Sequence, residues 1–172
     1  TDITSVTVPD EMEIAEGVFS ECEKLTTVVV GNDVTIGKYA FGMDRGRIIA
    51  GVYQSSSHNI VLVDECMLED KTADKIIVDI RNMLPKFKLT AYNEDTGKGF
   101  LRHVLVKRGF ATGQVMVVLV TGSGIFPGKK DFLKALLKAH EEITTVIWNI
   151  NSAKTSLVLG KKEEILYGNG YI

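Results

Sequence analysis

The sequence predicts an α+β fold, in which a mixed or antiparallel sheet carries two amphipathic helices and follows two short β repeats. Three observations support this prediction. The opening segment repeats itself at a fixed offset, two later segments have helical periodicity, and short apolar runs bounded by turn residues surround those helices. Strands and helices grouped in this way favour an α+β domain over a regular β-α-β array.

Residues 1–42 contain two copies of one pattern. Ile3–Phe19 aligns with Leu25–Phe41 at a constant offset of 22 residues, so that Val6 meets Val28. A period in the low twenties with one short strand and one turn per unit is typical of leucine-rich-type repeats. Because about three units are needed for a self-standing stack, we expect these strands to add to a sheet edge, in this domain or, by self-association, in another copy of the chain.

The endings of the two copies differ. The first closes with "VFSEC", whereas the second continues from Phe41 into "GMDRG". With its "PD" and "GN" turns, the segment resembles the leucine-rich repeats of bacterial cell-surface proteins. This resemblance implies a surface adhesion or interaction role, which stands as the alternative function.

The larger part, residues 43–172, has no such period. Its first helix is predicted to begin at Asp70 or Thr72, either of which can cap it, and to end before Pro85. The second helix is predicted over residues 127–142. The inward side chains are Ala73, Ile76, Ile77, Ile80, Met83 and Leu84 on the first helix, and Phe132, Leu133, Leu136 and Leu137 on the second.

Seven strands are predicted around these helices. A hairpin is expected at "GFATG", between "LRHVLVKRG" and "TGQVMVVLVTG". The other predicted strands are "RGRIIAGVYQ", "HNIVLVD", "ITTVIWNIN", "TSLVLG" and "EILYG".

Charge is unevenly distributed along the chain. Residues 1–42 hold two Lys and eight acids, or 2 − 8 = −6, and residues 43–172 hold the other 18 bases and 14 acids, or +4. This asymmetry indicates two parts with different partners, although short segments also scatter in charge by chance. The longest apolar run, Val115–Val120, is far too short to span a bilayer, so no membrane partner is expected.

Residues 43–172 resemble the central domain of the 23S ribosomal RNA uracil-C5 methyltransferases, which use S-adenosylmethionine. The matching segments are, in order, "GRIIAGVYQSSSHNIVLVDEC", "GKGFLRHVLVKRG", "TGQVMVVLVT", "FP", "NIN" with "TSLVLG", and "LYGNGYI". The resemblance implies ribosomal RNA as a partner and a bacterial cytoplasmic location for this part. In that family a separate Rossmann-like domain binds the methyl donor and carries the catalytic cysteine.

We therefore expect an enzyme fragment with no catalytic residue and no cofactor of its own, inactive in methyl transfer by itself. Many members of the family also hold an iron–sulfur cluster with four cysteines. Cys66 matches the isolated fourth ligand, and Cys22 matches none. Because one thiolate cannot hold a cluster, no metal site is expected, and Cys66 should be an ordinary thiol. The junction between the two parts is either natural, in a chimeric chain, or artificial.

The segment Gly97–Gly109 carries the candidate RNA contacts. Cationic side chains suit phosphate, but cations on a strand also keep sheet edges from aggregating, and both interpretations stay open. Strand alternation places Arg102 on one face with Val104 and Val106, and His103 on the other face with Leu105 and Lys107. The candidates are Lys98, Arg102, His103, Lys107 and Arg108.

Other polar features favour structural roles. Thr121–Asp131 has the wrong spacing for a phosphate-binding loop, so a tight turn before a helix is expected. The histidines, among them His58 and His140, are expected to be structural or at the surface. Trp148 is predicted in the core. Asn149 and Asn151, on the opposite face of the same strand, could meet a ligand or cap a turn.

Overall fold

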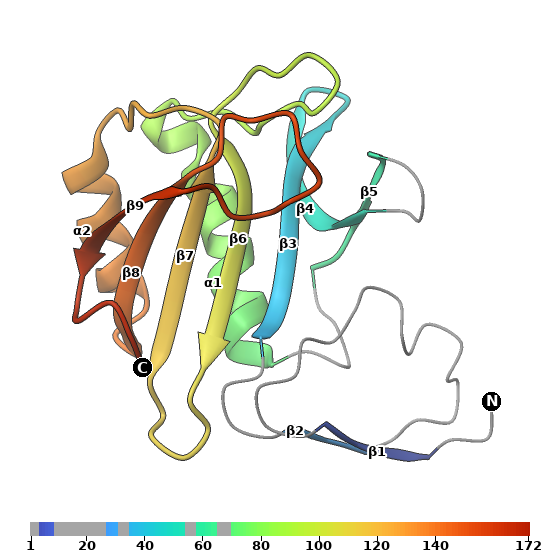
Figure 1. Ribbon diagram of the computed structural model, residues 1–172, viewed down its shortest axis with the longest axis vertical. Coiled ribbons are helices and arrows are strands. Elements are labelled where there is room, and N and C mark those ends of the chain that lie inside the picture. Colours follow the sequence, from blue (N-terminus) through green and yellow to red (C-terminus); the bar gives the residue numbers. More distant parts are fainter. Residues whose placement is uncertain (1–3, 9–26, 31–34, 54–57, 65–69) are drawn as a thin grey trace.

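The computed structural model describes residues 4–8, 27–30, 35–53, 58–64 and 70–172, and all structural statements below concern these residues. Their main feature is a seven-stranded sheet of order β5-β4-β3-β6-β7-β8-β9 (Figure 1). The strands are β3 (Thr35–Asp44), β4 (Arg47–Tyr53), β5 (Ile60–Leu62), β6 (Leu101–Arg108), β7 (Val115–Thr121), β8 (Ile143–Ile150) and β9 (Lys162–Tyr167).

The sheet is mixed, as the sequence predicts. Neighbouring strands are antiparallel except β7 and β8, which are parallel. A parallel pair needs a crossover, and α2 (Lys129–Ala139) supplies it between these two strands. The predicted hairpin lies between β6 and β7, with Arg108 opposite Val115.

Helix α1 (Lys71–Met83) begins where a side chain can accept its first amide hydrogens. The carboxylate of Asp70 accepts from the backbone N–H of Thr72 at 2.9 Å and of Ala73 at 3.3 Å. Of the two predicted caps, Asp70 is therefore the one used. Proline ends the helix, and a 3-10 turn, η1 (Pro85–Phe87), follows it.

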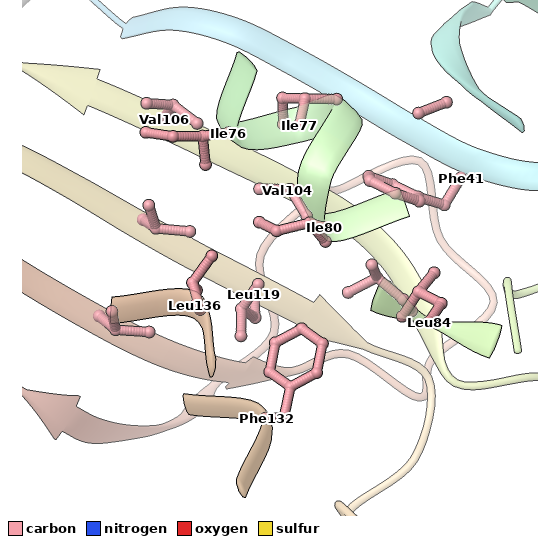
Figure 2. Close-up of a cluster of buried hydrophobic side chains, with 14 of the residues drawn as sticks. Phe41, Ile76, Ile77, Ile80, Leu84, Val104, Val106, Leu119, Phe132 and Leu136 are labelled. Carbon is pink, nitrogen blue, oxygen red and sulfur yellow. The ribbon is translucent and has the colours of Figure 1, made fainter. Parts of the chain in front are cut away.

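Both helices cover the same face of the sheet, here called the helical face. Figure 1 shows α1 behind the strands, and Figure 2 shows its apolar side chains meeting those of β6 and β7. The predicted inward residues are buried or, for Met83, Leu133 and Leu137, partly buried against this core. The most deeply buried members include Phe41, Ile76, Ile80, Leu84, Val104, Leu119, Phe132 and Leu136.

The opposite face, here called the loop face, has a second and smaller apolar cluster. It consists of Leu105, Met116, Val118, Val120 and Ile147, with Val158 and Ile172 packed against it. The chain between β8 and β9, residues 151–161, passes over this face, in front of the strands in Figure 1. The sheet is thus covered by helices on one side and largely by irregular backbone on the other.

One predicted strand is wrong. "TSLVLG" lies within the irregular connection between β8 and β9, where Leu157 and Leu159 are exposed. Its alternating apolar residues resemble a strand in sequence. In the fold, however, polar side chains of neighbouring elements hold its backbone, as described below.

The N-terminal part is described only in short segments. Strands β1 (Ser5–Val8) and β2 (Thr27–Val30) pair in parallel, with Val6 opposite Val28. This register has the offset found in the sequence. The two strands form a separate sheet and do not extend an edge of the larger one. The predicted boundary between residues 42 and 43 falls inside β3, whose last residues pair with β4.

Neither α1 nor α2 has the length and apolar composition needed to cross a bilayer.

Ile80 offers a test of the packing between α1 and the sheet, because its side chain is fully buried. We expect Ile80→Ala to lower the free energy of unfolding by about 2–5 kcal/mol, since the change removes buried apolar contacts and leaves a cavity. Urea denaturation followed by circular dichroism measures this. Asn82→Ala, at an exposed position on the same helix, is the control and should change stability by less than about 0.5 kcal/mol. Equal effects of the two substitutions would contradict this packing.

Candidate functional site

Strand β6 and its flanking turns carry all five cationic or imidazole candidates, but the fold does not bring them together. Lys98 lies in the turn before β6 and is exposed, whereas Lys107 and Arg108 end the strand and are half-buried. A strand rises about 3.3 Å per residue, so Arg102 and Arg108 are roughly 20 Å apart along it. The candidates therefore fall into two groups at opposite ends of the sheet.

Arg102 lies where the alternation of β6 side chains between the two faces of the sheet is interrupted. The register between β6 and β7 shifts between Leu101 and His103, and Leu101 packs in the same core as Val104. Two residues three positions apart share a face of a strand only where an extra residue is inserted, so this is a bulge. Regular alternation predicts Arg102 on the face shared by Val104 and Val106. Because of the bulge, its side chain does not lie on that face.

The guanidinium of Arg102 has an internal role. Its Nε and Nη2 donate to the two carboxylate oxygens of Glu94, at 2.5 and 2.8 Å. Its remaining N–H groups reach three backbone carbonyls of the connection between β8 and β9. The acceptors are Asn151 O at 3.2 Å, Ala153 O at 3.0 Å and Thr155 O at 3.0 Å.

All five N–H groups of this side chain are thereby used. Only 2% of Arg102 is exposed, and the ring of Tyr92 lies 5.0 Å from its Cζ. A phosphate contact at Arg102, as the sequence predicts, does not fit this burial. The residue instead ties the turn that holds Glu94 to the chain that follows β8.

The other half of this connection is held by two asparagines. Asn151 Nδ2 donates to Leu157 O and Val158 O, and its Oδ1 accepts from the backbone N–H of Ala153. Asn149 and Gly160 exchange two hydrogen bonds, of 3.1 and 2.7 Å. A Cβ at Gly160 would lie 1.9 Å from Ile150 O, so a glycine is needed for this approach. Of the two predicted roles for these asparagines, the fold shows turn capping.

His103 is buried, 5% exposed, on the side of the sheet near β4. The ring of Tyr53 lies edge-on to it, with centroids 6.1 Å apart, and also contacts His58 at 6.0 Å. His58 is exposed and lies 3.4 Å from Asp95. Tyr53, His58 and Asp95 border a cavity of about 330 Å³ whose lining also includes Asp44 and Glu94. Its carboxylates make it unsuited to a phosphate group.

At the far end of β6, Arg108 is also committed to the fold. Its Nη1 donates to Asp70 Oδ2 at 2.5 Å, and its Cζ lies 5.5 Å from the ring centroid of Phe110. Because Asp70 caps α1, Arg108 links the end of this strand to the start of the helix. Lys107 is half-buried and, within the described part of the chain, forms no ion pair.

The remaining polar candidates have structural positions. Trp148 is buried and its Nε1 donates to Thr121 Oγ1 at 2.8 Å. His140 is fully buried between Asp79, at 3.0 Å, and Glu142, at 3.2 Å. The segment before α2 forms a turn that ends at Gly128, with φ +64°.

Cys22 and Cys66 lie outside the described residues. Within the described ranges, no three His, Cys, Asp or Glu side chains are placed to hold a metal ion.

Sequence reasoning missed Glu94 and Lys154. Glu94 lies in a polar turn, "NEDTGKG", and precedes its partner by eight residues, a spacing with no periodic meaning. Lys154 lies between two predicted strands, "ITTVIWNIN" and "TSLVLG". No local pattern marks either residue, because both acquire their neighbours only through the fold.

Comparison with known proteins identifies relatives of this chain. It is 39% identical over 131 residues to an RNA methyltransferase of Clostridium tetani, a match that covers 76% of this chain and 28% of the relative. Matches of the same length to RNA methyltransferases of Clostridium acetobutylicum and Bacillus cereus have 38% and 32% identity. The chain thus spans less than a third of the length of these relatives. No protein-family model matches the sequence.

Among solved structures, the fold matches that of the Pyrococcus abyssi tRNA (uracil-54, C5)-methyltransferase in complex with S-adenosyl-L-homocysteine. The TM-score is 0.61 at 20% identity, and the match covers 96% of this chain and 34% of the other. Neither these relatives nor this structure supports leucine-rich repeats, a chimeric chain or the adhesion alternative. The chain is therefore homologous to part of bacterial RNA methyltransferases and shares its fold with part of a tRNA uracil-C5 methyltransferase.

Proposed function

We propose that this chain is an RNA-contacting scaffold within an S-adenosylmethionine-dependent RNA uracil-C5 methyltransferase, with ribosomal RNA as the substrate. The observation that carries the proposal is the identity of 39% over 131 residues to an RNA methyltransferase. The likeness of fold to a tRNA uracil-C5 enzyme supports the C5 position of uracil as the site of modification.

We infer a scaffold role because methyl-donor binding and nucleophilic attack are assigned to another domain. The family resemblance assigns both the donor and the cysteine nucleophile to another domain, and this chain matches only 28% of its relative in Clostridium tetani. We propose that residues 43–172 are the central domain of such an enzyme, and that the chain alone binds neither the methyl donor nor an iron–sulfur cluster.

Contact with RNA is proposed for two lysines near the two ends of β6. Lys98 is exposed at one end of β6, and Lys107 is half-buried at the other end. Phosphate contacts supply most of the affinity of proteins for nucleic acids, and they position the protein without reading the base sequence. A scaffold with separated lysines suits this positioning task.

Methyl transfer by the isolated chain is the first test. We expect no incorporation of a labelled methyl group from S-adenosylmethionine into ribosomal RNA by the 172-residue chain. The reason is that donor binding and nucleophilic attack are assigned to residues outside it. A full-length relative, assayed in parallel, is the positive control. Turnover above background by the chain itself would refute the scaffold role.

RNA binding is the second test. We expect the chain to bind single-stranded ribosomal RNA segments, with an affinity that falls as salt rises, because lysine–phosphate contacts release counterions. Fluorescence anisotropy at several salt concentrations measures this, with transfer RNA as a comparison. Lys98→Glu and Lys107→Glu should each weaken binding, whereas Lys134→Glu, at an exposed position on α2, should not. A dissociation constant above about 10⁻⁴ M, even at low salt, would count against the proposal.

A further inference from the structure

We infer that residues 151–160, within the connection between β8 and β9 (residues 151–161), form a preordered RNA-contact element. In it, Lys154 meets a backbone phosphate, and Arg102 is the residue that positions the loop. The inference rests on the proposed function and goes beyond it, since it assigns the contact to a segment with no cationic pattern in the sequence.

Buried polar side chains hold this loop in place. The loop contains no helix or strand. Its backbone is nevertheless hydrogen-bonded along its length by three side chains that are each 2% exposed or less, namely Arg102, Asn149 and Asn151. Buried polar groups are costly unless they are fully bonded, so these contacts favour one loop conformation. A surface loop fixed in this way is a typical place for a binding contact.

The loop presents both polar and apolar side chains to solvent. Ser152, Lys154 and Ser156 are exposed, and so are Leu157, at 69%, and Leu159, at 50%. Hydroxyl and ammonium groups donate to phosphate oxygens, and apolar side chains can pack against ribose and base faces. Only Val158 of this stretch packs on the cluster of the loop face, so covering the sheet does not require the two outward leucines.

The loop lies next to the turn before β6. The Cε of Lys154 lies 3.8 Å from the position that a Cβ at Gly97 would occupy, beside Lys98. Glu94, in the same turn, is bonded to Arg102. One guanidinium therefore fixes both segments and brings two lysines, 56 residues apart in sequence, to one rim of the molecule.

Lys98 and Lys154 contribute positive charge to this rim. Neither Lys98 nor Lys154 forms an ion pair with any carboxylate in the described part of the chain. Of the acids in this turn, Glu94 is paired with Arg102, whereas Asp95 is exposed and lies 3.4 Å from His58. Two ammonium groups that lack a carboxylate partner among the described residues can then act on the same stretch of RNA backbone.

The salt dependence of binding tests the phosphate contact at Lys154. For a single strand, loss of one lysine–phosphate contact should reduce the slope of log affinity against log salt by about 0.7. We expect this reduction for Lys154→Ala, by a similar amount for RNAs of different sequence, with an unchanged melting temperature. Lys138→Ala, an exposed lysine on the helical face, is the matched control and should leave the slope unchanged.

The outcomes separate this inference from the proposed function. If the unmodified chain shows no salt-dependent binding, the proposed function fails. If it binds RNA but Lys154→Ala behaves like Lys138→Ala, only the inference about this loop is overturned.

A double-mutant cycle tests the positioning role of Arg102. If Arg102 acts through the loop, Lys154→Ala should no longer change the salt slope once Arg102 is replaced by Lys, which cannot supply five N–H donors. Should Arg102→Lys fail to fold, Asn151→Ser takes its place in the cycle, because it removes the bonds to Leu157 and Val158. Full additivity of the slopes would overturn the positioning role.

Discussion

The pairing of Arg102 with Glu94 is the constraint on which one end of the molecule depends. Moving a guanidinium out of water costs several kcal/mol, and this loss is offset only where every donor finds an acceptor. Here two carboxylate oxygens and three backbone carbonyls provide the acceptors. Those carbonyls belong to a loop with no secondary structure, so the same bonds that satisfy the cation also order the backbone. Loss of either partner would leave buried polar groups unbonded on both sides, because the turn before β6 and the loop after β8 share this one side chain.

The position of β6 in the sheet explains why its ends are so rich in cations. It lies between β3 and β7, with helices on one face and irregular chain on the other. Its apolar middle belongs to the two cores, whereas its ends reach the elements that surround the sheet. At one end Arg102 bonds to two loops, and at the other Arg108 bonds to the cap of α1. These two arginines thus connect a central strand to its surroundings, and the lysines next to them are the cations left for solvent or for a ligand.

Sequence patterns predict the parts of this fold that depend on local periodicity. Both helices, the hairpin of β6 and β7, and strands β8 and β9 have apolar residues at regular spacing, and each was predicted close to its observed position. The sequence does not predict strand β3, because residues of this strand align with the first repeat and are therefore assigned to a repeat unit. The segment "TSLVLG" has the alternation of a strand, but its backbone groups are taken by Arg102 and Asn151. The bulge at Arg102 is likewise invisible in sequence, since a period of two assigns it to the wrong face. Each failure involves a contact between residues far apart in the chain, which no local pattern records.

The way the loop after β8 is held also bears on the energetics of RNA binding. A single-stranded RNA loses conformational freedom when it binds, and a flexible protein loop would add a loss of its own. In this fold the ordering of residues 151–160 takes place during folding, when Arg102, Asn149 and Asn151 bond to their backbone. Lys154 is then presented in one place before any ligand arrives, beside Lys98 from a turn held by the same guanidinium. In the RNA contact proposed above, the buried arginine would contribute to recognition without touching RNA, because it shifts an entropic loss from binding to folding.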